Sequence, residues 1–166
     1  MEEVNLSQAN LIGANLSRTR IFNSDLRGVD LTNANLDGIS LSVVNLSKAN
    51  LNGTDLSNVS YFVRVNLSYA DLQGSDLSGI GRTTQDLYEL NLSNANLSGA
   101  DLSRAVLRQS VNLAGANLNG ADLRGSDLSR TDLRNANLRN AKLSSSESLR
   151  GAKLQGAIMP DGTIYK

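Results

Sequence analysis

Carboxylates are the side chains of this sequence best suited to acid–base chemistry, because it contains no His and no Cys. Without those residue types there is no thiolate nucleophile, no zinc site built from imidazole or thiolate, and no side chain that naturally titrates near pH 7. The usual parts of hydrolase, redox and metal mechanisms are therefore missing. We expect a protein that is not an enzyme, with no catalytic, metal or cofactor-binding residues.

The carboxylates also have a structural explanation. Most aspartates and many asparagines stand directly before a leucine, in units such as "ADL" and "ANL". Short polar side chains at chain corners hydrogen-bond to nearby backbone groups. We therefore do not interpret the carboxylates as acid–base pairs.

A large apolar residue recurs every five residues over 6–56, 62–77, 87–107, 113–143 and 149–159, and the residue two before it is usually small. Residues two apart in an extended segment share a face, so each unit contributes one large and one small residue to a core. A fixed short period is typical of a solenoid.

Five residues are too few for an amphipathic helical face, and the intervening Asn, Asp, Gly and Ser favour turns. Four short extended pieces joined by corners make a square coil, and coils stack as parallel strands about 4.8 Å apart. With one unit allowed for an irregular stretch near Arg82, the sequence has 31 units, or about eight coils. Parallel crossovers are almost always right-handed, so the predicted fold is all-β, a right-handed quadrilateral parallel β-helix.

The units "ANLNG", "ADLRG" and "SDLSR" resemble those of the pentapeptide repeat family. The resemblance covers about residues 4–159 and implies the same quadrilateral β-helix. The C-terminal "GAIMPDGTIY" is similar to the tails of cyanobacterial members. The resemblance also implies two activities, regulation by protein contact and DNA mimicry acting on a type II topoisomerase.

We expect one domain over 1–166, with an irregular loop at 79–90 and a C-terminal cap at 158–166. Pro160 cannot donate to a ladder and "PDG" favours a turn, so Ile164 and Tyr165 should fold over the last leucines. Val4 and Leu6 begin the core with no covering segment. The chain is therefore expected to be a monomer or a dimer through its N-terminal end.

No apolar run approaches the ~18 residues of a membrane span, so no membrane partner is expected. The absence of cysteine fits the reducing cytoplasm, and a presequence removed from the chain stays an open alternative.

The departures from the repeat gather near one face. Counting four units per coil from Leu6, we expect the fourth face to stack Ile21, Leu41, Phe62, the irregular slot near Arg82, Leu102, Leu123 and Leu143. The side chains predicted to point outward on or beside this face, and to bind a protein partner, are Phe22, Val43, Tyr61, Val63, Arg64, Tyr69, Arg82 and Tyr88. Exposed aromatics and arginines anchor many protein interfaces. The alternative is that a solenoid tolerates insertions and single exposed apolar residues without any function.

Two registers are open around residue 61. Phe62 inside and Tyr61 outside is preferred, because Ser60 then supplies the small core residue two positions earlier. The other register reverses the two aromatic residues.

The charge distribution is uneven along the chain. Residues 1–101 hold eleven acids and six bases, a balance of −5, and residues 102–166 hold five acids and ten bases, a balance of +5. The arginines of the basic half are expected on all four faces, whereas nucleic-acid binding requires a stripe, so no nucleic-acid partner is expected. Zero net charge also argues against a DNA mimic. A rigid scaffold that binds an unidentified protein is the preferred function, and DNA mimicry is the alternative.

Overall fold

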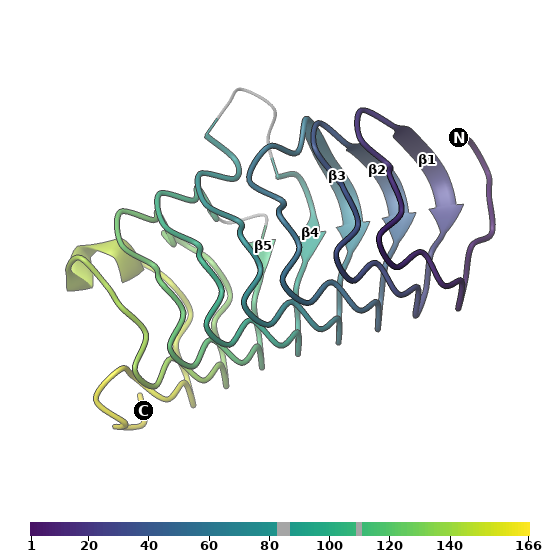
Figure 1. Cartoon of the computed structure of the whole chain (residues 1–166). Coiled ribbons are helices and arrows are strands. Elements are labelled where there is room, and N and C mark those ends of the chain that lie inside the picture. The colour runs from purple at the N-terminus through teal and green to yellow at the C-terminus, as the bar shows by residue number, and fades with distance from the viewer. Residues whose placement is uncertain (83–86, 109–110) are drawn as a thin grey trace.

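The structure is a computed structural model that describes residues 1–82, 87–108 and 111–166, and it shows a rod of stacked coils (Figure 1). One parallel sheet contains five strands in chain order. Their bounds are β1 (Arg20–Asp25), β2 (Ser40–Asn45), β3 (Tyr61–Asn66), β4 (Leu90–Asn91) and β5 (Val111–Asn112). A 3-10 helix, η1 (Ser146–Leu149), lies near the C-terminal end.

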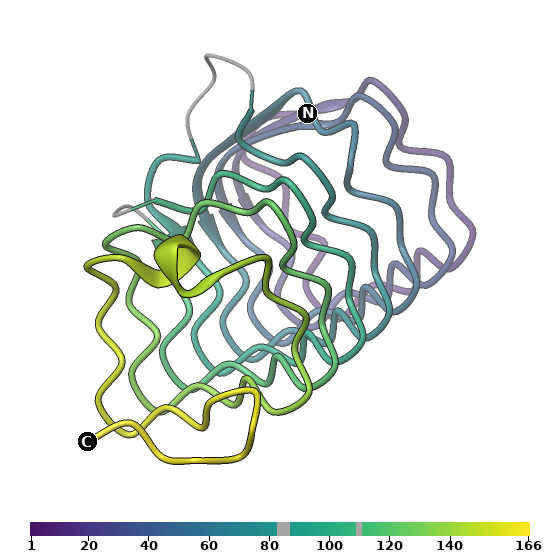
Figure 2. The same ribbon diagram turned by 90° about the vertical axis from the view of Figure 1, so that its left-hand side faces the viewer.

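Isolated parallel bridges continue the same pairing around the other faces, so the coils lie one behind another (Figure 2). One column of paired residues passes through the described rod: Asn5, Asp25, Asn45, Asn66, Asn91, Asn112, Asp132 and Lys153. The predicted all-β parallel solenoid is confirmed.

Each regular corner is a tight turn with one residue in the left-handed region. At residues 6–9 the Ala9 N–H donates to the Leu6 carbonyl at 3.0 Å, and Gln8 has a φ of 61°. Positive φ at the third residue is the geometry of a type II turn. The Asn5 side-chain oxygen accepts the Ser7 N–H at 2.9 Å. The polar residue before each leucine therefore serves the backbone, as the sequence predicted.

The interior consists of large and small residues in alternation. Leucines line the core, and the residue two before each is most often a buried alanine, although branched residues such as Val29, Ile39 and Val44 also take this position. Buried hydroxyls replace some alanines. Thr54 and Ser75 donate within their own turns, to the Leu51 carbonyl at 2.7 Å and the Leu72 carbonyl at 2.8 Å, whereas Thr131 donates to the Leu107 carbonyl of the preceding coil. Within the described part of the chain, no buried side-chain nitrogen or oxygen lacks a hydrogen-bond partner. The predicted core pattern is therefore correct.

The irregular stretch differs from the expectation. Ile80 and Leu87 are both buried and take the small and large core positions of a single unit. Val63 pairs with Tyr88, which places Leu87 next to Phe62 in the stack, and the Val106 N–H donates to the Ile80 carbonyl at 2.8 Å. The separate slot near Arg82 is therefore wrong. The chain instead inserts residues between the two halves of one unit.

This insertion changes the fourth face. Its core residues are Ile21, Leu41, Phe62, Leu87, Leu107, Leu128 and Leu149, whereas Leu102, Leu123 and Leu143 belong to the third face. The predicted loop at 79–90 is too wide, because Ile80, Leu87 and Leu90 are buried. Within that predicted loop, residues 83–86 lie outside the described residues. The Arg82 side chain is exposed, in agreement with its predicted outward direction.

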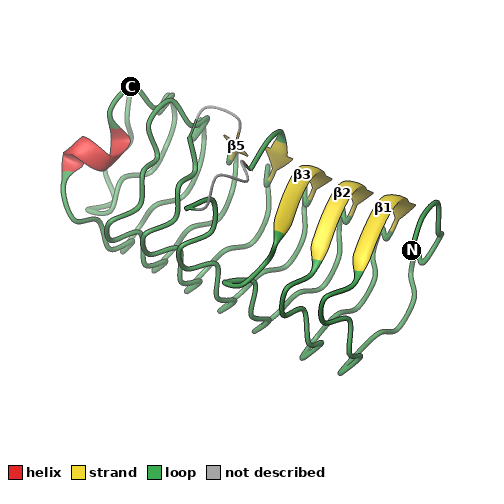
Figure 3. Ribbon diagram, turned by 90° about the horizontal axis from the view of Figure 1, so that it is seen from above, coloured by secondary structure: helices red, strands yellow, loops and turns green. Residues whose placement is uncertain are grey.

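With the corrected register, every interruption of the five-residue period adjoins the fourth face. The extra residues fall between core positions 56 and 62, 77 and 87, 107 and 113, and 143 and 149. The strands and η1 accordingly lie along one side of the rod (Figure 3). The other faces keep the short, regular units.

The two ends of the rod are closed to different extents. At the C-terminal end Ile158 pairs antiparallel with Ile164, and the Met159 N–H donates to Thr163 at 2.8 Å. The side chains of Ile164 and Tyr165 are 66% and 46% exposed, so the expectation that they cover the last leucines is wrong. At the N-terminal end the leucines of the first coil are only partly buried. No helix in the described ranges is long and apolar enough to cross a membrane.

Val43 has a φ of 57°, although a branched Cβ makes the left-handed region costly. Asn23 holds the equivalent position one coil earlier, with a φ of 47°. We predict that Val43→Asn raises the free energy of unfolding by about 1 kcal/mol, because Asn tolerates this conformation. Urea unfolding measures the change, and Asn23→Val should lower stability by a similar amount. A destabilised Val43→Asn variant would contradict the prediction.

Asp122 predicts how stability depends on pH. The Arg124 side chain holds the pKa of this carboxyl at about 2, against an ordinary 3.8. A pKa that is lower in the folded chain stabilises the fold above the unfolded value, and that stabilisation is lost as pH falls from about 4 through about 2. We expect Asp122→Asn to lose less stability than the wild type over this interval, as measured by urea unfolding at several pH values. Equal losses would show that Asp122 has no part in acid sensitivity.

Candidate protein-binding face

The fourth face presents its outward side chains in rows that follow the rod axis. Directly after the core position, paired residues run Phe22, Ser42, Val63 and Tyr88. Directly before it, Arg20, Ser40 and Tyr61 are paired on β1, β2 and β3. Parallel pairing places neighbours in each row about 4.8 Å apart. Side chains distant in the sequence therefore form one continuous surface.

This surface is rich in exposed apolar groups. Phe22 and Tyr88 are exposed and Val63 is half-buried. Tyr61 is 39% exposed, whereas Phe62 is 2% exposed, so the preferred register at this point is confirmed. We call the group Phe22, Tyr61, Val63 and Tyr88 the aromatic patch.

Polar groups border the aromatic patch on one side. Arg64 lies beside Val43 in the row two residues after the core position, and its Nε donates to a carboxylate oxygen of Glu89 at 3.1 Å. The Arg64 guanidinium and then the Tyr88 side chain hold the pKa of Glu89 below its ordinary value. Exposed ion pairs of this kind contribute little to stability. The pair is thus free to exchange partners on binding at small cost.

The structure brings together six of the eight residues predicted for partner binding: Phe22, Val43, Tyr61, Val63, Arg64 and Tyr88. Tyr69 is exposed but lies in a turn of the first face, where its N–H donates to Ser93. Arg82 lies at the border of the third and fourth faces, in a hollow with Arg104 and Arg124. These two residues lie outside the aromatic patch.

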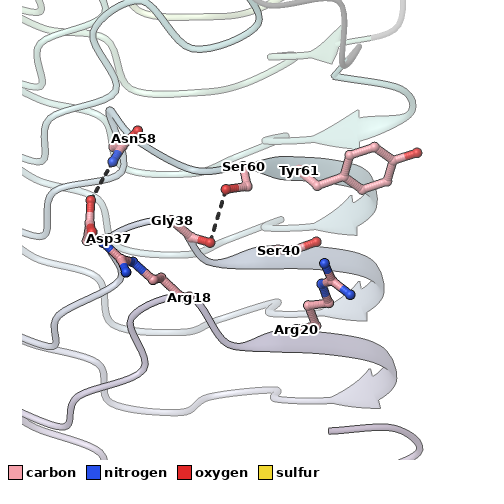
Figure 4. A pocket seen from close by; sticks show the side chains of 8 residues that line it. All are labelled: Arg18, Arg20, Asp37, Gly38, Ser40, Asn58, Ser60 and Tyr61. Carbon is pink, nitrogen blue, oxygen red and sulfur yellow. Dashed lines mark hydrogen bonds between the residues drawn. The ribbon is translucent and has the colours of Figure 1, made fainter.

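Another hollow adjoins the aromatic patch at Tyr61 (Figure 4). Its lining residues are Arg18, Arg20, Asp37, Gly38, Ser40, Asn58, Ser60 and Tyr61. Gly38 opens the hollow, because a Cβ there would lie 3.3 Å from Cγ of Arg18. The Ser60 hydroxyl donates to the Gly38 carbonyl at 3.1 Å, and the Asn58 amide donates to Asp37.

Arg18 and Arg20 were not among the predicted site residues. Both belong to regular units of the first coil, whereas the predicted residues lie at or near departures from the repeat. Arg18 stands two residues after the core residue Leu16, and Arg20 stands directly before the core residue Ile21. The repeat alone therefore places both side chains outward at one corner. The surface thus combines aromatic groups with two cations.

The carboxylates of the described residues are engaged mainly by the backbone. No group of three or more Asp or Glu residues in the described ranges could hold a metal ion. The aspartates that precede leucines are engaged by backbone N–H groups, as Asp101 is by Ser103 at 2.8 Å. What the surface offers is apolar area, hydroxyls and guanidinium groups.

The comparisons with known proteins agree with the repeat. The family model for pentapeptide repeats matches residues 1–38, 24–60, 60–80, 86–111 and 109–144. No curated protein matches the sequence.

Three solved structures are similar to this chain: two of pentapeptide repeat proteins and one of a fluoroquinolone resistance protein. HetL, a pentapeptide repeat protein involved in heterocyst differentiation regulation in the cyanobacterium Nostoc sp. strain PCC 7120, is 28% identical with a TM-score of 0.47, over 99% of this chain and 93% of HetL. QnrB1, a plasmid-mediated fluoroquinolone resistance protein, is 20% identical with a TM-score of 0.43, over 92% of each chain. Rfr23 from the cyanobacterium Cyanothece 51142 is 24% identical with a TM-score of 0.29, over 92% of this chain and 90% of Rfr23.

Proposed function

This chain belongs to the pentapeptide repeat family, and on that premise we propose that it is a non-enzymatic rigid scaffold or regulator that binds another protein through its fourth face. The observation that carries the proposal is the aromatic patch, in which Phe22, Val63 and Tyr88 lie in one paired row. Rigid exposed aromatics are the side chains from which interface hot spots are built.

The strained backbone beside the aromatic patch supports the same proposal. Val43 occupies the left-handed region, where the neighbouring coil uses Asn23 at much lower cost. Backbone strain of this kind concentrates at functional sites. An apolar side chain kept at this position enlarges the surface available to a partner.

The regular faces offer a partner little to recognise. They repeat short polar side chains with a period of one coil, so a partner displaced by about 4.8 Å would meet nearly the same groups. On the fourth face each coil differs from the next: Ser42 separates Phe22 from Val63, and Tyr88 follows. Tyr69 is a single exposed aromatic on the first face, whereas the fourth face groups several such side chains and therefore best fixes where along the described rod a partner binds.

DNA mimicry is the alternative function, and one feature of the third face favours it. Asp55, Asp76, Asp101 and Asp122 are paired in succession and form an acidic row. Their spacing is about 4.8 Å, whereas duplex DNA carries one charge per ~1.7 Å of axis. Asp122 is also held by Arg124, and the row is followed by Lys142. The charge density of this row is too low for a duplex mimic.

We propose that any dimer of this chain forms by contact between the N-terminal ends of two copies. Leu6, Leu11 and Leu16 are only partly buried, while Leu26, Leu31 and Leu36 at the same positions of the next coil are buried. A second copy placed against the first coil would cover these side chains and pair its open edge.

We predict that the triple substitution Phe22→Ser, Val63→Ser, Tyr88→Ser weakens binding of the natural protein partner at least tenfold, because losing buried aromatic anchors typically costs ≥2 kcal/mol. The partner is obtained by affinity capture from the source organism and titrated by calorimetry. The thermal transition should change little, because these side chains point away from the core.

Tyr69→Ser is the matched control. It removes an aromatic side chain that is more exposed than Phe22 or Tyr88, but from the first face, so it should leave affinity within about twofold. If the triple variant bound the partner as tightly as the wild type, the fourth face would not be the binding surface.

We also predict that the wild-type protein does not inhibit DNA gyrase, because the acidic row has about a third of the charge density of a duplex. A supercoiling assay over a range of protein concentrations measures this directly. Inhibition that disappears in an Asp76→Asn, Asp101→Asn variant would make mimicry the better function.

A further inference from the structure

Arginines lie against glycines of the next coil at both borders of the fourth face. Arg18 packs over Gly38, Arg104 over Gly125 and Arg130 over Gly151, with the arginine Cγ 3.3, 3.6 and 3.8 Å from where a glycine Cβ would be. At corners of the first face the stacked residues are amides instead: Gln8 over Gly28, Asn94 over Gly115 and Asn135 over Gly156. Arg139 on the second face also lies against a glycine, Gly162, so stacked arginines mark both borders of the candidate surface but are not confined to them.

Two of these arginines share the border between the third and fourth faces. Arg18 lines the hollow with Arg20, and Arg104 lines the hollow with Arg82 and Arg124. Among the described residues, Asp122 pairs with Arg124, and no ion pair holds Arg18, Arg20, Arg82 or Arg104. Each hollow therefore presents at least two guanidinium groups without a carboxylate partner in the described part of the rod.

The missing side chain of each glycine leaves room for the aliphatic stem of the arginine, whose Cγ lies closest to it. A planar guanidinium recognises a carboxylate through two parallel hydrogen bonds, provided the approach is open. Ser40 and Ser60 in the first hollow, and Ser78 and Ser103 in the second, supply hydroxyl groups beside the arginines. In the Arg18–Arg20 hollow the Arg18 guanidinium lies toward Asp37 and the Arg20 guanidinium toward Ser40 (Figure 4), so each hollow offers separate guanidinium and hydroxyl donors to a carboxylate.

We propose that this border binds an acidic segment of the partner protein, whose carboxylates enter the Arg18–Arg20 hollow and the Arg82–Arg104–Arg124 hollow. The inference rests on the proposed function and names the chemistry of the partner. Arg18, Gly38, Asn58, Gly79 and Arg104 follow one another along the border, four steps of about 4.8 Å, or roughly 19 Å in all. An extended segment of about six residues spans that distance.

An acidic protein segment fits this border better than a nucleic acid does. Asp37 lies inside the first hollow, and the acidic row of Asp55, Asp76, Asp101 and Asp122 adjoins the border on the third face. A phosphate backbone with a charge every ~1.7 Å would be brought against these carboxylates. A protein segment can place its carboxylates at the hollows and neutral side chains between them, and its apolar residues can reach the aromatic patch at Tyr61.

The test uses a fluorescein-labelled peptide of six Glu-Ser repeats, titrated with the whole protein at low salt and followed by fluorescence anisotropy. The double variant Arg18→Gln, Arg104→Gln should weaken binding about four- to ninefold, because each exposed charge contact is worth roughly two- to threefold in affinity. Glutamine is suited to this turn position, because Gln8 has a φ of 61° there and already packs over Gly28.

The matched control is Lys48→Gln, Arg139→Gln. It also removes one positive charge from each half of the chain, but on the first and second faces, and Lys48 has the same turn position as Arg18 with a φ of 61°. This control should change peptide affinity by less than about twofold. A peptide of Lys-Ser repeats should not bind.

Three results would overturn the proposal: no binding of the Glu-Ser peptide, equal losses in the two double variants, or tighter binding of a short DNA duplex that depends on Arg18 and Arg104. The probe has no apolar side chains, so substituting Phe22, Val63 and Tyr88 should leave its affinity unchanged. Failure of the arginine sites is therefore distinguishable from failure of the aromatic patch.

Discussion

The left-handed residue at each corner is the constraint on which the rest of the rod depends. A positive φ at Gln8, and at the same place in most later units, turns the chain within four residues so that it can return after twenty. Only then do the N–H and C=O groups of successive coils come into line, as when the Leu26 N–H donates to Asn45 at 2.8 Å. The frequent glycines and asparagines at this position follow from the low cost of the left-handed region for them.

Because the ladder and the core follow from a local rule, much of the fold could be predicted from the sequence. Leucine spacing defined the core positions, and Ser60 was enough to choose between Tyr61 and Phe62 as the buried residue. The position of the insertion could not be found this way. Ile80 lies five residues after the small core residue Ser75, and Arg82 lies five residues after the core leucine Leu77, so the spacing alone allows the repeat to continue through both. Pairing of Val63 with Tyr88, a contact between residues 25 apart, decided it.

The candidate site was predictable only in part, for the same reason. Outward side chains were correctly assigned one unit at a time, but which of them are neighbours depends on the register across coils. Tyr69 and Tyr88 were expected close together, yet they occupy different faces once Leu87 is placed beside Phe62. Arg18 could be placed outward at a corner from the repeat, but nothing in its own regular unit distinguished it, because its significance comes from Gly38, twenty residues later.

The confinement of all interruptions to one face makes the rod adjustable in length. Twenty residues of regular repeat, inserted between core positions 113 and 133, would lengthen it by one coil, about 4.8 Å, while every row on the other faces stays aligned. The aromatic patch and the Arg18 hollow would not move relative to each other, since both lie before the insertion, and the C-terminal end would move farther from them in fixed steps. For a partner that binds two points on this chain, the distance between those points would thus change only in steps of one coil, about 4.8 Å.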